Sequence, residues 1–326
     1  LVEEKEPWCN DVSSIADIAI LSAFAVNKKE SESASLSDTG AGRILSEKHY
    51  LYDIIDSECD FSKYKVIILP DCVESNENVD KKLAEYISNG GKILASGLSG
   101  KGILPGIEIG EQRELKPNYM HPVSENGFVN GITEYVMYTD SYRFEPSPEY
   151  KTVAYTVDTY FNRTSEHFCS HQHTPNRPGF LTKGSVISDN IGYIDHKIFE
   201  DYAVKGELHC KELCDMMLSS LLGEDRTASV EGLPDRGVFT LLYQKENNRL
   251  ISHILYAHTS IRGKNVEAIE DCVPLYNVSV KIRTEKAVKN VRLVPEGQSL
   301  PFEYKDGLLT YTVPKTLIHS MVEISF

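Results

Sequence analysis

The chain has 326 residues, of which 48 are acidic and 34 basic, so its formal net charge is −14. This balance argues against binding to nucleic acids or anionic lipid surfaces, because both attract clusters of lysine and arginine. The hydrophobic fraction of 41% suffices for packed cores, and the length predicts about two domains. The longest apolar run, residues 15–26, contains Asp17 and is too short to cross a bilayer.

The cysteines bear on the cellular compartment. Seven of them, an odd number, are scattered along the chain, and only Cys210 and Cys214 lie close together. Such scatter is typical of reduced thiols in a cytosolic protein and does not suggest a disulfide framework. No basic segment followed by an apolar one opens the chain, so no secretory signal is visible. These features predict a cytoplasmic protein.

The first part of the chain alternates between predicted strands and helices. Short apolar runs at residues 16–21, 65–70 and 92–97 predict buried strands. Residues 76–89 predict the clearest helix, which Gly90 and Gly91 end. A second helix is expected over residues 40–57, after a Ser/Glu-rich loop at 28–38. Helices between apolar strands indicate a parallel sheet covered on both faces, that is, a doubly wound, flavodoxin-like α/β sandwich.

The middle of the chain is less regular. Residues 135–142 and 151–160 alternate as strands, and residues 184–188 are expected to form the last strand of the sheet. A helix is predicted over 208–222, and residues 223–226 mark a domain boundary.

Beyond residue 226 the hydrophobic period changes to two. A hairpin turn is expected at 245–248, between strands at 238–243 and 250–257. Further strands are predicted at residues 273–282, 288–294, 308–313 and 320–324. This pattern indicates an all-β sandwich. The predicted organisation is a linker over residues 1–13, an α/β domain over 14–225 and a β-sandwich domain over 226–326.

Three segments of the first domain carry a family resemblance. Residues 16–21, ADIAIL, residues 64–71, YKVIILPD, and residues 83–97, LAEYISNGGKILASG, together resemble the β-galactosidase trimerisation domain. That domain follows the catalytic barrel in family-42 glycoside hydrolases and in related enzymes, some of them α-fucosidases. Residues 306–314 and 322–324 resemble, more faintly, the closing strands of such enzymes. The doubly wound fold is also similar to that of class I glutamine amidotransferases.

The resemblance implies a homotrimer that supports a barrel with two catalytic carboxylates. A barrel needs about 250 residues, and neither it nor a carboxylate motif is visible here, so no catalytic residue is assigned. The predicted function is therefore the non-catalytic oligomerisation and support region of a glycoside hydrolase acting on β-galactosides or α-fucosides. The expected partners are copies of the chain, the missing N-terminal barrel and, through the parent enzyme, an oligosaccharide. No cofactor or metal is predicted.

Residues 167–177 form the most unusual stretch. In an extended chain, His167, Cys169, His171 and His173 would share one side and could present ligands to zinc, although the spacing fits no structural zinc signature. Two alternatives are that the loop reaches an active site, its own or that of a neighbouring subunit, and that it is only an internally hydrogen-bonded turn. The candidate substrate contacts are His167, His171, His173, Asn176 and Arg177.

Two further functions remain open. A Cys-dependent, amidotransferase-like hydrolase would use Cys72, which follows a predicted strand but lacks the Gly-x-Cys-x-Gly elbow. A stand-alone carbohydrate-binding protein would present a row of sandwich tyrosines, namely Tyr243, Tyr256, Tyr276 and Tyr311. The glycine-rich stretch 97–102 lacks the spacing of a phosphate-binding loop and is interpreted as a connection.

Overall fold

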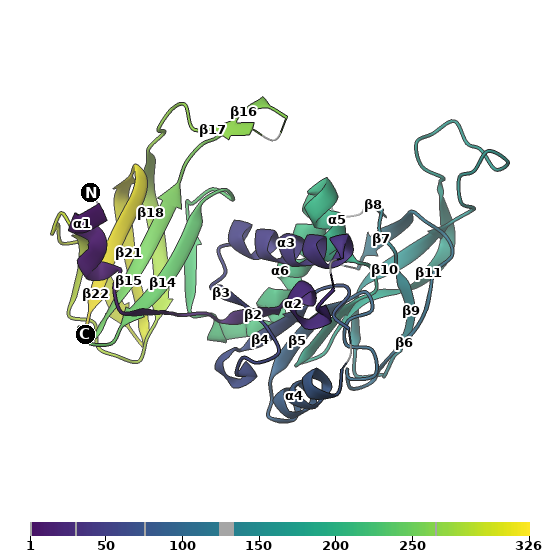
Figure 1. Cartoon of the computed structure of the whole chain (residues 1–326), viewed down its shortest axis with the longest axis horizontal. Helices are drawn as coiled ribbons and strands as arrows, with labels where there is room; N and C mark the ends of the chain where they lie inside the picture. The colour runs from purple at the N-terminus through teal and green to yellow at the C-terminus, as the bar shows by residue number, and fades with distance from the viewer. Residues whose placement is uncertain (1, 30, 75, 124–133, 265) are drawn as a thin grey trace. The chain divides into compact units, whose positions relative to one another are not determined.

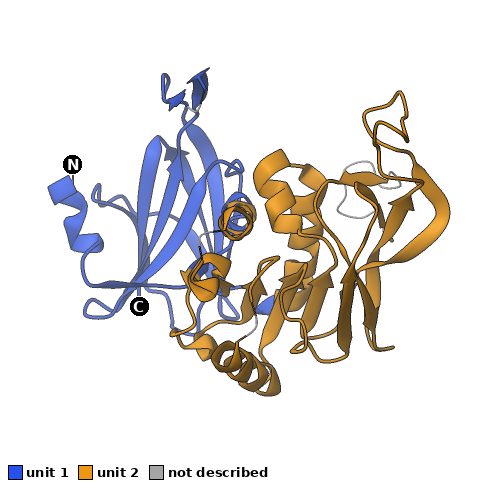
Figure 2. Ribbon diagram, turned by 45° about the vertical axis from the view of Figure 1, so that its right-hand side comes forward, with its two compact units in different colours: residues 1–17, 45–53, 224–326 blue, residues 18–44, 54–223 orange. Residues whose placement is uncertain are grey.

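The computed structural model describes residues 2–29, 31–74, 76–123, 134–264 and 266–326. The chain divides into two compact units (Figure 2). Unit 1 comprises residues 1–17, 45–53 and 224–326, and unit 2 comprises residues 18–44 and 54–223. The stretch expected to be a linker, residues 1–13, therefore belongs to unit 1, where β1 (Val12–Ser14) pairs with a strand of the sandwich.

Unit 2 is built on a nine-stranded sheet of order β3-β2-β4-β5-β12-β11-β10-β7-β8 (Figure 1). The strands are β2 (Ile18–Leu21), β3 (Tyr52–Ile55), β4 (Val66–Leu69), β5 (Lys92–Ser96), β7 (Asn118–Pro122), β8 (Tyr135–Met137), β10 (Lys151–Thr159), β11 (Asn176–Ile187) and β12 (Ile191–Ile194). Pairing is parallel from β2 through β4 and β5 to β12, and antiparallel from β12 to β8. The sheet is thus mixed, and the expected parallel sheet is only one part of it. A separate pair consists of β6 (Ile107–Gln112) and β9 (Tyr142–Pro146).

The three strands predicted from apolar runs are confirmed. All residues of β2 and β4 are buried, as are the last four of β5, because parallel strands are covered on both faces. Figure 1 shows α4 (Glu77–Ser88) on one side of these strands and α3 (Glu32–Glu47) with α6 (Leu208–Leu222) on the other. The short helices α2 (Ala23–Asn27) and α5 (Ile198–Lys205) complete the unit.

Helix α4 follows the sequence rules closely. The Asn76 side chain caps it by accepting a hydrogen bond from the Val79 N–H at 3.0 Å. Val79, Leu83 and Tyr86 are buried on one face, and Gly90 adopts a φ of +86° just beyond the end. The helix predicted over 208–222 is likewise confirmed as α6.

The helix predicted over residues 40–57 is wrong in both limits. Helix α3 starts at Glu32, inside the expected Ser/Glu-rich loop, and residues 52–55 form strand β3. The Ser37 and Thr39 hydroxyls donate to the carbonyls of Ser33 and Ser35, so both hydroxyls find hydrogen-bond acceptors within the helix itself.

Strand positions in the middle of unit 2 also differ from expectation. Residues 184–188 contain only the end of the long strand β11, and the missed strand β12 is the one that pairs with β5. The stretch 135–142 divides between β8 and the start of β9. None of the described helices is long and apolar enough to span a membrane.

Unit 1 is a β-sandwich, as predicted. One sheet has the order β1-β14-β15-β22-β19 and the other β13-β18-β21-β20. Its strands beyond β1 are β13 (Ala228–Glu231), β14 (Val238–Gln244), β15 (Arg249–Tyr256), β18 (Leu275–Arg283), β19 (Asn290–Val294), β20 (Phe302–Lys305), β21 (Leu308–Thr316) and β22 (Ile318–Ser325). A small hairpin, β16 (Ser260–Gly263) and β17 (Val266–Ala268), interrupts the connection from β15 to β18.

The N-terminal residues of unit 1 are held by a buried carboxylate. Glu323 on β22 accepts hydrogen bonds from the Trp8 indole at 2.6 Å and from Arg249 at 2.5 Å. Arg292 reaches its other oxygen at 2.8 Å. Burial by itself would raise the pKa of Glu323, but these donors and cations outweigh it and lower that pKa. The carboxylate therefore stays ionised and joins the first residues of the chain to the sheet.

Two stacked histidines lie beside this contact. The Nδ1 atom of His253 is 3.1 Å from Nε2 of His319, and the Lys5 ammonium is 2.8 Å from Nδ1 of His319. Because Lys5 only donates, His319 carries its proton on Nε2 and donates it to His253. Desolvation, followed by the charges of His319 and Lys5, lowers the pKa of His253 to about 4, and desolvation also lowers that of His319. Glu296 acts on His319 in the opposite direction.

This arrangement predicts an acid-sensitive unit 1. Between about pH 6.5 and pH 4 the unfolded chain binds a proton at His253 that the folded chain does not, so stability falls as the pH falls through this range. We expect a loss of roughly 2 kcal/mol in the free energy of unfolding. Urea unfolding followed by Trp8 fluorescence measures it. The loss should shrink in His253→Gln and persist in a variant of the exposed His258, His258→Ala. An equal loss in both variants would refute this explanation.

Candidate functional site

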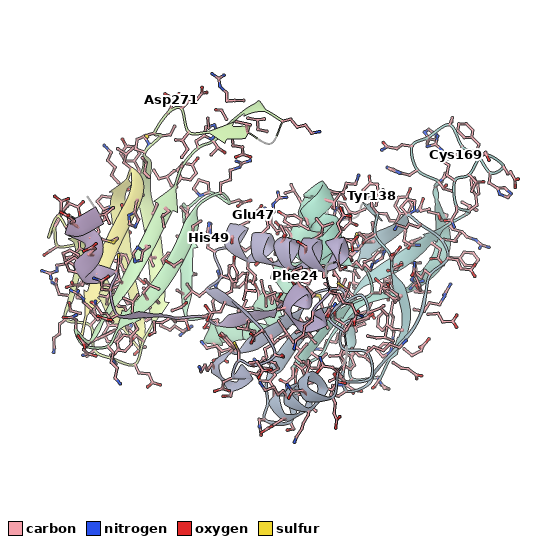
Figure 3. All side chains as sticks on the ribbon, viewed as in Figure 1. Phe24, Glu47, His49, Tyr138, Cys169 and Asp271 are labelled. Carbon is pink, nitrogen blue, oxygen red and sulfur yellow. The ribbon has the colours of Figure 1, made fainter. Side chains whose placement is uncertain are left out.

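The histidine-rich loop lies between strands β10 and β11 of unit 2. The two strands pair up to Thr159 and Asn176, and residues 160–175 leave the sheet between them. Figure 3 marks this loop by Cys169, at the end of the long β10–β11 hairpin. No strand is formed within the loop, so the expected alternation of its side chains does not occur.

Two side chains hold the base of the loop. Asn162 accepts a hydrogen bond from the Lys116 N–H at 2.8 Å and donates one to the Glu114 carbonyl at 2.7 Å. On the other side, the Tyr119 hydroxyl donates to the Thr174 carbonyl at 2.9 Å. The loop is therefore fixed at both ends by a neighbouring segment and by strand β7.

The tip of the loop is bonded internally. The Thr164 N–H donates to the His167 carbonyl at 2.9 Å, and the Thr164 hydroxyl accepts from the His167 N–H at 3.0 Å. The Cys169 thiol points to the carbonyls of His171 and His173, at 3.6 Å from each. These contacts give the tip the internally hydrogen-bonded turn that was one of the three interpretations.

His173 has a defined partner at the base of the loop. Its Nε2 atom lies 3.1 Å from the Tyr138 hydroxyl, and the two rings meet edge to face at 5.2 Å. The Tyr138 N–H donates to the buried carboxylate of Asp201 at 2.8 Å, and the Lys205 ammonium lies 4.8 Å from the centre of the Tyr138 ring. Tyr138 therefore couples the loop to helix α5.

The five candidate residues do not form one cluster. His167 and His171 are exposed at the tip, whereas His173 lies at the base. Asn176 donates to Glu134, and the Arg177 guanidinium stacks on the Phe180 ring at 3.5 Å. Within the described residues, no group of three or more His, Cys, Asp or Glu side chains could hold a metal ion. The zinc interpretation therefore has no support in the geometry.

A buried ionic network, missed from the sequence, lies at the end of β12. Asp195 accepts from the Thr156 hydroxyl at 2.8 Å and contacts His196 at 2.6 Å and Arg113 at 3.3 Å. Arg113 is also 3.6 Å from Asp158 on β10. These residues come from three distant parts of the chain, so no local signal indicates the network. It fixes the antiparallel strands from which the loop projects.

Groups from neighbouring elements of unit 2 fill the space at the carboxyl end of strand β4. Asp71 accepts from the Ser37 and Ser96 hydroxyls, at 2.9 and 2.6 Å, and from the first N–H groups of helix α5, including that of Glu200 at 2.7 Å. Burial raises the pKa of Asp71 to about 6, against these donors, so the group is ionised at neutral pH. This edge, where ligands bind in many α/β sheets, is thus occupied by protein groups.

Cys72 does not have the surroundings of a nucleophile. Burial raises the pKa of its thiol, and the Ser37 hydroxyl lies 3.9 Å from its sulfur. No described histidine hydrogen-bonds to it. A catalytic cysteine needs a lowered pKa or an adjacent base, so the geometry gives the Cys-dependent hydrolase no support.

The four sandwich tyrosines do not form a flat binding row. Tyr311 is buried in the core, where its hydroxyl lies 2.6 Å from that of Ser252. Tyr243 and Tyr256 are partly buried against the same core, whereas Tyr276 is 62% exposed. A carbohydrate surface made of these four rings is therefore ruled out.

Comparison with known proteins bears on the trimerisation-domain resemblance. Residues 43–102 match the family model of the β-galactosidase trimerisation domain. A β-galactosidase from Clostridium perfringens is 40% identical to this chain over 48 residues, which are 15% of this chain and 7% of that enzyme. The resemblance of residues 64–71 and 83–97 to this trimerisation domain is thereby confirmed.

Solved structures extend the likeness to the whole chain. α-L-Fucosidase isoenzyme 2 from Paenibacillus thiaminolyticus is 38% identical, with a TM-score of 0.95 over 100% of this chain and 51% of its own. A β-galactosidase from Bacillus circulans sp. alkalophilus is 14% identical, with a TM-score of 0.58 over 99% of this chain and 43% of its own, and shares the fold. The chain spans about half the length of the fucosidase that it matches.

Proposed function

We propose that this chain, which carries the β-galactosidase trimerisation domain, is the non-catalytic oligomerisation and support region of a glycoside hydrolase. The observation that carries the proposal is the likeness of the whole chain to part of an α-L-fucosidase, at 38% identity and a TM-score of 0.95. This likeness favours an α-L-fucoside over a β-galactoside as the substrate of the parent enzyme. The catalytic carboxylates would then lie in an N-terminal barrel outside the two units described above.

The chemistry of the buried carboxylates supports a non-catalytic role. Asp71, Asp195 and Glu323 are each held by three or more hydrogen-bond donors or cations of the protein itself. A glycosidase instead needs two carboxylates that flank an accessible sugar. The surroundings of these three carboxylates are explained by a role in stabilising the fold.

The strand order supports a flavodoxin-like architecture for unit 2. In β3-β2-β4-β5-β12, the strands counted in chain order run 2-1-3-4-5, the order of flavodoxin-like sheets. The antiparallel extension from β11 to β8 is then an addition to that fold, and it carries the histidine-rich loop.

We assign the self-association surface to the β10–β11 hairpin. Its exposed apolar side chains are Tyr160, Phe168, Phe180 and Leu181. Residues 160–183 also contain three basic residues and one acidic residue, whereas the whole chain has a net charge of −14. An apolar surface with basic residues is complementary to an acidic copy of the same chain. The partner we propose is therefore a second copy, within a homotrimer.

All seven cysteines are free, and Cys9 and Cys272 are exposed. Exposed free thiols fit a reducing compartment, which supports a cytoplasmic location.

The loop at the end of this hairpin would contact the substrate bound to a neighbouring subunit. His171 is exposed, while Tyr138 positions His173, so the loop offers imidazole groups to sugar hydroxyls on a fixed base. In the full-length parent enzyme, we expect His171→Ala with His173→Ala to lower kcat/KM on an aryl α-L-fucoside about tenfold. The oligomer should stay intact in sedimentation.

A matched control is His258→Ala, which removes an exposed imidazole from unit 1. It should leave kcat/KM unchanged. Unchanged kinetics in the double variant, with the oligomer intact, would exclude a role of the loop in substrate contact.

A further inference from the structure

A pocket of about 420 Å³ lies within unit 1, between the sheet that contains strand β14 and the end of strand β18. All of its lining residues belong to unit 1, so it is separate from the histidine-rich loop of unit 2. Its volume falls within the usual range of small-ligand sites, about 300–1,000 Å³. The side chains that line it determine which ligand it suits.

Strand pairing brings the apolar side chains of the pocket onto one face. Cross-strand pairs place Ser13 beside Tyr243 and Tyr243 beside Leu250. Leu250 pairs in turn with Ile324 of the core. Phe326, two residues beyond Ile324, packs against the same core, because alternate strand residues point to the same side. The inner face of one sheet therefore forms a continuous apolar wall, whose members are Ile15, Leu241, Tyr243, Leu250 and Phe326.

The ammonium group of Lys286 lies against this wall. Its Nζ atom is 4.5 Å from the centre of the Tyr243 ring and 5.2 Å from that of the Phe326 ring. It donates to the Tyr243 hydroxyl at 2.9 Å and to the Asn248 side-chain oxygen at 2.8 Å. Both acceptors are neutral, and an ammonium group has three donors. One donor and the positive charge therefore remain for a ligand.

The segment that carries Lys286 is locally basic. Residues 281–289 contain four basic residues and one acidic residue, whereas the whole chain has a net charge of −14. Lys281 and Arg283 form ion pairs with Glu231 and Glu224. Among the described contacts, no carboxylate forms an ion pair with Lys286, although Glu285 also lines the pocket. An anion can therefore pair with Lys286 without displacing a protein carboxylate.

A ligand that matches both features has an apolar body and a single anionic group. We propose that this pocket binds an aliphatic monocarboxylate, with its chain on the apolar wall and its carboxylate paired with Lys286. A neutral apolar ligand is disfavoured, because it would desolvate the ammonium group without supplying a counter-charge. The proposal is independent of the assembly function and of the catalytic barrel.

Isothermal titration calorimetry with the full chain tests the proposal, with octanoate and decanoate as probes. We expect saturable binding of one molecule per chain. Each buried methylene tightens binding about fourfold, so decanoate should bind at least about tenfold more tightly than octanoate. The neutral 1-octanol should bind about tenfold more weakly than octanoate, because it lacks the carboxylate. Absence of saturable decanoate binding, or equal binding of octanol and octanoate, would overturn the proposal.

Two variants locate the binding site. Lys286→Gln removes the charge but keeps a side chain that can hydrogen-bond to Tyr243, and it should weaken octanoate binding about tenfold while leaving octanol binding unchanged. Ser13→Trp, at an exposed position beside Tyr243, places a ring in the pocket and should abolish binding of both probes. Circular dichroism compares both variants with the wild type. If Ser13→Trp does not fold, the exposed Lys286→Gln decides alone.

Lys289→Gln is the matched control, because Lys289 is exposed in the same basic segment but does not line the pocket. It should bind octanoate like the wild type. Equal octanoate affinity of the wild type and Lys286→Gln, or an equal loss in Lys286→Gln and Lys289→Gln, would refute the assigned site. Neither result would bear on self-association, which is measured separately.

Discussion

Replacing Glu323 by alanine is expected to destabilise unit 1 by about 3 kcal/mol. The substitution leaves Arg249, which is largely buried, without its carboxylate at 2.5 Å and removes the acceptor of the Trp8 indole. Removing one partner of a buried ion pair costs more than the pair contributes, because the remaining charge stays desolvated. Arg292 is 40% exposed and regains water, which limits the loss. Urea unfolding followed by circular dichroism measures the change.

The fluorescence of Trp8 provides a second measurement on the same variant. Trp8 is the single tryptophan of the chain, and it packs on Ile251, Val294 and Met321. If Glu323 holds the N-terminal residues, the emission of folded Glu323→Ala should shift to the red. Glu246→Ala, in the exposed β14–β15 turn, is the control and should change neither quantity. A stable Glu323→Ala variant with unchanged emission would contradict this assignment.

Replacing Asp71 by alanine is expected to destabilise unit 2 by about 3 kcal/mol. Two hydroxyls, Ser37 and Ser96, and two N–H groups at the start of α5 would lose their common acceptor in a buried site. Each unsatisfied buried donor has a desolvation cost, and the helix loses its N-terminal acceptor. The helical circular dichroism of the chain reports on this unit, since α3 to α6 form its helical part.

Lys28→Ala is the matched control for Asp71→Ala. Both residues have a positive φ, +51° at Lys28 and +37° at Asp71, but Lys28 is exposed. The control therefore tests the same backbone conformation at a position without the hydrogen bonds that Asp71 accepts. It should change the free energy of unfolding by less than about 0.5 kcal/mol. Equal effects of the two substitutions would attribute the loss to backbone strain.

Local signals predicted the elements that local chemistry determines. Asn76 and Gly90 bound α4 because a cap and a left-handed glycine act within a few residues. The buried strands around Ile67 and Ile93 follow from apolar runs. Helix α3 was misplaced because its serines are usually found in loops, and here Ser37 bonds to its own helix and to Asp71.

Non-local contacts explain what the sequence did not predict. Arg113, Thr156 and Asp195 meet only through strand pairing, so the network beneath the loop has no motif. Within the loop, the Cys169 thiol points to the His171 and His173 carbonyls, which removes the alternation on which the zinc interpretation depended.

Sedimentation equilibrium of the purified chain tests the central claim most directly. If the chain is an assembly region, it should form, at micromolar concentration, a species of three times its mass of 36.6 kDa. The proposed hairpin surface predicts that Phe180→Glu dissociates this species while leaving the fold intact, since Phe180 is half exposed. A wild-type chain that remains monomeric at every concentration would contradict the account.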